Sequence, residues 1–180
     1  MRFSDQLRYL WGLEMESEFF VFTLALAILL CALVSGLLLG FAVVVMPGVA
    51  KLSDKDFLLS FKHMDGIIQN NQPLFMLVWV GSILSVLASG ILGTMDLSGQ
   101  EAVLLWLGCA WYLVGVQLPT IIFNIPLNNT IQGLEIDKLN ESELTNSRIN
   151  FEAKWNRWNR IRTANGIITV SVFLSLLYLL

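Results

Sequence analysis

Two short polar segments of this chain carry side chains that could bind a small molecule. Residues 124–129 read Asn-Ile-Pro-Leu-Asn-Asn and follow an almost wholly apolar run. Residues 155–162 read Trp-Asn-Arg-Trp-Asn-Arg-Ile-Arg and come directly before the last apolar run. Amides donate and accept hydrogen bonds, guanidinium groups donate them, and indole rings offer a flat apolar face. Because such groups are costly to bury without partners, their concentration at the ends of apolar runs predicts a site there.

The amides outnumber what helix capping requires. One Asn is enough to end a helix, yet residues 124–129 hold three. Asn70 and Asn71 occupy a similar position, just before the apolar run that starts at Pro73. We expect these amides to converge near one membrane face. The candidate ligand-binding residues are Asn70, Asn71, Gln117, Asn124, Asn128, Asn129, Trp155, Trp158, Asn159 and Arg162.

Structural roles compete with a binding role in the second polar segment. Trp155 and Trp158 could be aromatic anchors at the membrane interface. The neighbouring arginines could hold anionic lipid headgroups. This explanation accounts for the tryptophans and arginines, but not for Asn156 and Asn159 between them.

Gln117 is the one strong polar side chain deep in the third apolar run. Pro119 lacks a backbone N–H, so a carbonyl on the preceding turn loses its helical partner. Gln117 could bond that carbonyl or a ligand, and we favour the structural role.

His63 is the only histidine and the only ready general base, which makes it the catalytic candidate. Its alternative role is that of an interfacial histidine on a polar helix.

The sequence has no metal-binding pattern of His, Cys and carboxylates, and we expect no metal site. It also lacks a phosphate-binding loop, a dinucleotide fingerprint and a serine-nucleophile elbow. Cys31 and Cys109 lie inside apolar runs and predict no disulfide.

Composition predicts an integral membrane protein. Hydrophobic residues make up 56% of the 180 residues and charged residues only 14%, and the mean hydropathy is +0.68. A net charge of −3 gives no basic surface for nucleic acid. Four runs are long enough to span a bilayer as helices, which predicts a single all-α membrane domain over residues 1–180. The runs are 19–46, 73–92, 102–123 and 164–180.

The two long connections predict amphipathic helices on one membrane face, at about residues 53–71 and 141–162. In the first, Phe57, Phe61, Met64 and Ile68 recur at helical spacing. Nine of the eleven Lys and Arg residues lie in the connections 47–72 and 124–163. The positive-inside rule therefore places both long loops in the cytoplasm and both termini outside a cell membrane.

Four stretches carry a likeness to a known family. They are residues 45–49 (Val-Met-Pro-Gly-Val), 68–75 (Ile-Gln-Asn-Asn-Gln-Pro-Leu-Phe), 124–129, and the pattern Trp155-x-x-Trp158-Asn159-x-x-Arg162. In their order and spacing the chain resembles the anthrone oxygenase-like family of small four-helix membrane proteins, mostly classed as a domain of unknown function. The likeness covers the chain from about residue 19 to its end.

The resemblance implies an activity for the predicted site. Some family members oxidise anthrones to anthraquinones without a metal or an organic cofactor. Such chemistry needs a base, donors for a developing phenolate and an apolar aromatic pocket. By this resemblance the donors would be Asn124, Asn128, Asn159 and Arg162, and Trp155 and Trp158 would flank a flat ring. The resemblance points to no particular base, and His63 is the only ready one in the sequence.

Three hypotheses follow from these features. In the leading one, the protein binds a flat or amphipathic hydrophobic compound at the membrane face and could oxygenate it without a cofactor. In the second, it is a non-enzymatic scaffold or partner subunit whose polar loops dock another protein or lipid. In the third, it is a carrier subunit that forms a homodimer, because four helices alone would not enclose a path.

Overall fold

The computed structural model describes residues 3–180, with the side chains of residues 18–180, and every regular element in that part of the chain is helical. The predicted all-α membrane bundle is confirmed. Four helical segments of the described chain are long and apolar enough to cross a membrane. They are Glu18–Val49, Pro73–Asp96, Gly99–Gln132 and Glu141–Leu179.

Two of these segments are single helices and two are composite. Helix α4 spans Pro73–Asp96 and α7 spans Glu141–Leu179, so the second polar segment and the last apolar run form one helix. The first segment joins α1 (Phe3–Gly40), a π-helical turn (Phe41–Val45) and α2 (Met46–Val49). The third joins α5 (Gly99–Tyr112), π-helical turns at Leu113–Gln117 and Thr120–Asn124, and α6 (Ile125–Gln132).

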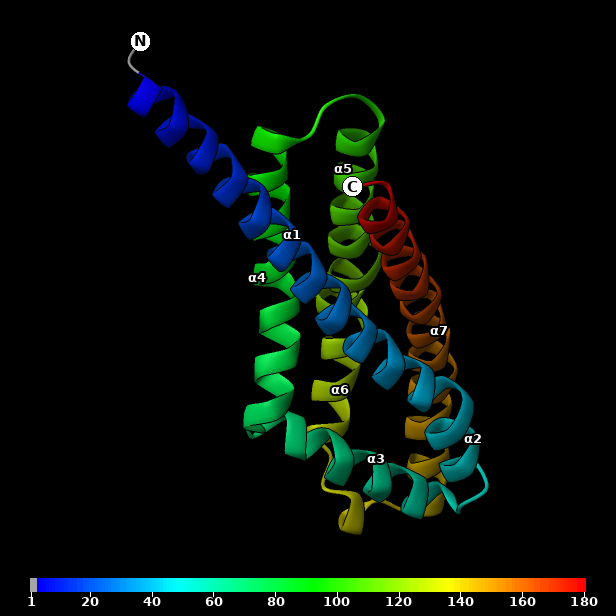
Figure 1. Ribbon diagram of the computed structural model, residues 1–180. Helices are drawn as coiled ribbons and strands as arrows, with labels where there is room; N and C mark the ends of the chain where they lie inside the picture. Colours follow the sequence, from blue (N-terminus) through cyan, green and yellow to red (C-terminus); the bar gives the residue numbers. More distant parts are fainter. Residues whose placement is uncertain (1–2) are drawn as a thin grey trace.

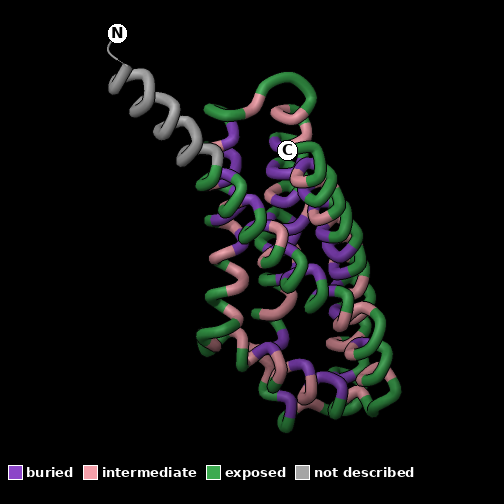
Figure 2. The backbone as a smooth tube through the Cα atoms, viewed as in Figure 1, coloured by how far each residue is buried: buried purple, intermediate pink, exposed green. Residues whose placement is uncertain are grey.

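Helix α3 (Asp54–Gln69) lies across one end of the bundle, at the foot of α4, α6 and α7 (Figure 1). The chain ends at the opposite end, near the α4–α5 connection. Helix α1 crosses the bundle diagonally and packs against α4 and α7, and α5 packs against α7. The outward faces of the long helices are exposed (Figure 2), and they carry leucine and isoleucine, as a lipid-facing surface requires.

The buried side chains form two clusters. One lies within the membrane-spanning part and includes Leu24, Val34, Tyr112 and Phe173. The other lies beside α3 and includes Phe57, Phe61, Phe151 and Trp155 from α3 and α7, packed through edge-to-face aromatic contacts. The second cluster arises because α3 buries Phe57 and Phe61 of the predicted stripe together with Leu58, whereas Met64 and Ile68 are only partly buried.

Local capping defines the ends of the two helices that carry polar site residues. The Ser53 hydroxyl accepts a hydrogen bond from the Asp56 backbone N–H and caps α3. Asn140 and Glu143 form a capping box at the start of α7, each side chain bonding the other residue's backbone N–H. A 3₁₀ turn at Ile136–Lys138 leads into this cap.

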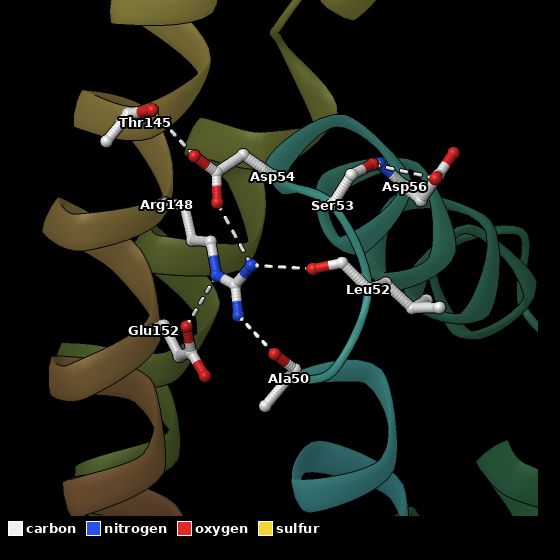
Figure 3. Close-up of polar contacts among 8 residues, drawn as sticks. All are labelled: Ala50, Leu52, Ser53, Asp54, Asp56, Thr145, Arg148 and Glu152. Carbon is white, nitrogen blue, oxygen red and sulfur yellow. Dashed lines mark hydrogen bonds and ion pairs between the residues drawn. The ribbon is translucent and has the colours of Figure 1, made fainter.

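Arg148 ties α7 to the loop before α3 (Figure 3). Its guanidinium donates to the Asp54 carboxylate at 3.0 Å and to the carbonyls of Leu52 and Ala50 at 3.0 and 2.7 Å. Its Nε donates to Glu152 at 2.8 Å. Because one planar group makes all four bonds, it fixes the start of α3 against α7.

The Arg148 cluster predicts that stability falls at low pH. The Thr145 hydroxyl, which donates to Asp54 at 2.6 Å, and the Arg148 guanidinium hold the pKa of the Asp54 carboxyl below its ordinary value of 3.8. A folded-state pKa lower than the unfolded one stabilises the fold at neutral pH, and this contribution is lost as the pH falls through 3.8 and below. Thermal unfolding in detergent should therefore show a larger acid-induced drop for wild type than for Asp54→Asn. Equal drops would contradict this assignment.

Candidate functional site

A cavity of about 430 Å³ lies where α3 closes the end of the bundle, between the two apolar clusters. Five helical segments contribute to it: the end of α1 with its π-helical turn, α3, α4, the third segment around Asn124, and α7. Its apolar wall includes Leu38, Phe41, Phe61, Phe75, Met76 and Trp79. Its polar groups include Asp65, Thr120, Asn124, Asn128, Asn159 and Arg162.

Arg162 is a buried cation in this cavity. Its side chain is 4% exposed, and it forms no salt bridge with any carboxylate of the described chain. Its Nη1 donates to the Thr120 hydroxyl at 2.9 Å, and its Nη2 donates to the side-chain oxygen of Asn159, Oδ1, at 3.1 Å. Asn159 is held in turn by donating to the backbone carbonyl of Leu38 at 3.0 Å. The Arg162 Nε is buried without a partner.

Asn124 presents an unused amide to the same cavity. The residue is 2% exposed, and both its Nδ2 and its Oδ1 lack a hydrogen-bond partner. Leaving a buried donor or acceptor unpaired costs about 1–3 kcal/mol for each group. The residue closes a π-helical turn, a local geometry often found at functional sites. A ligand that offers one acceptor and one donor would satisfy it.

A second polar network lies on the α3 side of the cavity. The Asp65 carboxylate accepts from Asn128 Nδ2 at 2.7 Å and from the side-chain amides of Gln69 and Gln132, each at 2.8 Å. The Asn128 carbonyl oxygen accepts from the Trp155 indole N–H at 2.8 Å. The predicted residues that line the cavity are thus Asn124, Asn128, Asn129, Trp155, Asn159 and Arg162.

Several predicted residues lie outside the cavity wall. His63 is exposed on α3, and Asn70 and Asn71 form the exposed turn between α3 and α4, with Asn71 in the left-handed region at φ 58°. Trp158 stacks on Phe123 with ring centroids 3.6 Å apart, so its ring already has a partner.

Gln117 does not line the cavity but bonds a residue that does. Its carbonyl oxygen accepts from the indole N–H of Trp79 at 3.0 Å, and Trp79 lines the cavity. The expectation that Gln117 bonds the carbonyl freed by Pro119 is wrong. That carbonyl belongs to Gly115, and it accepts from Asn165 Nδ2 at 3.0 Å, because α7 packs closely against this turn.

The sequence interpretation missed Asp65, Thr120 and Trp79 as site residues. Asp65 had a usable signal, because it follows Phe61 by four residues and therefore lies on the buried face of α3. A carboxylate on an otherwise apolar stripe is unusual and points to a polar partner or a site. Thr120 and Trp79 had no such signal, since both are ordinary residues of an apolar helix.

These features define a small multi-pass membrane protein whose helices enclose an amphipathic cavity at one end of the bundle. The family model described as Anthrone oxygenase matches residues 64–172, which is more than half of the chain. The chain therefore belongs to the anthrone oxygenase family, and the resemblance noted from its motifs is confirmed. No curated protein and no solved structure matches the chain.

The burial of Arg162 predicts an unusual response to mutation. Arg162→Met should change the free energy of unfolding by no more than about 1 kcal/mol, because the recovered desolvation cost of the buried cation offsets the loss of the donor to the Asn159 side-chain oxygen. Arg148→Met, the same substitution on the same helix, should lower stability because it leaves Asp54 and Glu152 without their partner. Thermal unfolding of both variants in one detergent makes the comparison. If Arg162→Met is as destabilising as Arg148→Met, Arg162 has a structural role.

Proposed function

We propose that this protein binds a flat, hydrophobic small molecule carrying phenol or carbonyl oxygens in the cavity, and oxygenates it without a cofactor. The observation that carries the proposal is the unpartnered amide of Asn124 in a cavity that also holds the unpaired cation of Arg162. Protein folding gains nothing from leaving such groups unsatisfied. A ligand whose oxygens meet both groups would supply the missing partners.

The rest of the wall suits a flat aromatic compound. Phe41, Phe61, Phe75, Trp79 and Trp155 contribute ring surfaces, and aromatic rings pack favourably against one another in offset or edge-to-face arrangements. The volume of about 430 Å³ falls within the usual range for small-molecule sites, about 300–1,000 Å³.

The ligand would reach the cavity from the lipid. Leu37, Met76 and Ile125 line the cavity and are 40%, 36% and 43% exposed. An apolar compound dissolved in the membrane could enter beside these side chains without crossing a polar layer. This route matches a substrate of low water solubility.

The family name suggests the reaction. In an anthrone, a methylene group next to aromatic rings and conjugated with a carbonyl is acidic. A base removes one proton, the electron pair spreads onto the carbonyl oxygen, and the electron-rich carbon reduces O₂ and forms a C–O bond. Protonation gives a hydroperoxide, and loss of water breaks the O–O bond and the remaining C–H bond to form a carbonyl. Overall, CH₂ and O₂ give C=O and H₂O.

Donors in a water-poor cavity would stabilise the charge that forms in the first step. Arg162 and Asn124 are such donors, because both have buried N–H groups without a partner. The electrostatic interaction is stronger here than in water, since apolar side chains surround the site.

Ligand binding can be tested with dithranol, a dihydroxyanthrone. We expect quenching of tryptophan fluorescence without oxygen, and formation of the quinone with O₂ consumption in air above the buffer rate. Asn124→Leu should weaken binding about tenfold or more, the equivalent of one to two hydrogen bonds in a buried site. Asn150→Leu, at an exposed position of α7, is the matched control and should bind as wild type does. Equal binding by both variants would refute this location of the site.

We also propose that the α3 end of the bundle faces the cytoplasm of a cell membrane, as the distribution of Lys and Arg suggests. A membrane-impermeant maleimide should label Ser98→Cys, in the α4–α5 connection, on intact cells. It should label Lys138→Cys, near α3, only after permeabilisation. Both native cysteines are buried, which keeps the background low. The reverse labelling pattern would invert the topology.

A further inference from the structure

The reaction proposed above needs a base, and His63 is poorly placed for that role. His63 is exposed and does not line the cavity. Asp65 does line the cavity and is 4% exposed. Two residues apart on a helix, the side chains lie on different faces, so only one of them can reach a ligand enclosed by the bundle.

The hydrogen bonds of Asp65 leave it one acceptor position. A carboxylate has about four lone-pair sites. Gln69 and Gln132 both donate to Oδ2, whereas Asn128 alone donates to Oδ1. Oδ1 therefore retains acceptor capacity for a proton from a bound molecule.

Side chains from two helices hold this carboxylate in place. Asn128 is itself fixed by the Trp155 indole, and Gln132 also donates to the backbone carbonyl of Lys62 at 2.9 Å. All the recorded partners of Asp65 are neutral amides, and no cation of the described residues pairs with it. The carboxylate is thus oriented without being neutralised.

The cavity therefore holds a carboxylate and a guanidinium that form no ion pair with each other. A buried charge normally has a partner of opposite sign, because burying it alone costs free energy. A molecule lying between them could present an acidic C–H to Asp65 and an oxygen to Arg162.

We propose that Asp65 is the base that removes the proton from the acidic C–H of the bound substrate, while Arg162 binds the oxygen that becomes negative. In this step the C–H bond breaks, the proton moves to Asp65 Oδ1, and the electron pair stays on the substrate and is delocalised onto its oxygen. This assignment rests on the proposed function, since it assumes that a C–H acid occupies the cavity.

Holding α3 against α6 is the competing role for Asp65, and two other bonds share that role. Lys62 Nζ donates to the Leu134 carbonyl at 2.6 Å, and Gln132 bonds the Lys62 carbonyl. Lys62→Met removes the first of these contacts and none of the hydrogen-bond partners of Asp65. It is therefore the matched control for a structural effect.

The test separates proton removal from the later steps with O₂. Dithranol is incubated with the detergent-solubilised protein in D₂O without oxygen, and exchange of its methylene protons is followed by NMR above the buffer rate. Wild type should accelerate exchange. Asp65→Asn should lose at least about 100-fold of that acceleration, the usual size of general-base catalysis, while binding dithranol within about threefold of wild type. Lys62→Met and His63→Ala should keep most of it.

The outcomes distinguish the two proposals. If Asp65→Asn binds and exchanges as wild type does, Asp65 is not the base, although the proposed function stands. If wild type neither binds dithranol nor accelerates exchange, both proposals fail. If Asp65→Asn loses its fold or its binding, Asp65→Glu decides, because it keeps the carboxylate. Exchange by that variant, with a pH profile shifted from wild type, supports the assignment. Intact binding without exchange overturns it.

Discussion

Asn128 makes the pair of hydrogen bonds on which the cavity depends. Its Nδ2 donates to Asp65 on α3, and its Oδ1 accepts from Trp155 on α7, at 2.7 and 2.8 Å. One short amide therefore sets the spacing of α3, α6 and α7. Because an unpaired polar group in an apolar interior costs free energy, these three partners remain together. Trp155 is also the centre of the aromatic cluster, so the polar and apolar parts of the site are positioned by the same residue.

The irregular helical turns around the cavity follow from the prolines. Pro47 and Pro126 are each the second residue after a π-helical turn, and Phe41 and Asn124 of those turns line the cavity. A proline cannot donate the helical hydrogen bond at its position, so the backbone before it is free to adopt a wider turn. Between them, Pro119 frees the Gly115 carbonyl, which Asn165 of α7 satisfies. The backbone is thus irregular where it encloses the site, while α4 and α7 are each one continuous helix.

Two arginines of α7 differ in how fully their donors are paired. Arg148 is satisfied by two carboxylates and two carbonyls and holds the loop before α3 (Figure 3). Arg162 has two neutral partners, and its buried Nε–H has none. The same residue type therefore stabilises the fold at Arg148, whereas at Arg162 it keeps an N–H group free to bond a ligand. The cost of the second position is offset by packing in the two apolar clusters, as is common where a site contains strained or unsatisfied groups.

The sequence by itself determined the membrane-spanning helices, because a bilayer admits only long apolar segments with internal hydrogen bonds. It also determined the family, through short motifs, and it identified Asn124, Asn128 and Arg162 as residues of interest. Only the tertiary structure decided which polar groups are already paired. Asp65 accepts hydrogen bonds from Asn128 and Gln132, which lie 63 and 67 residues away in the sequence. Trp158 and Asn159 are adjacent, yet one is stacked on Phe123 and the other holds Arg162. These roles depend on contacts between distant segments, which local sequence patterns do not encode.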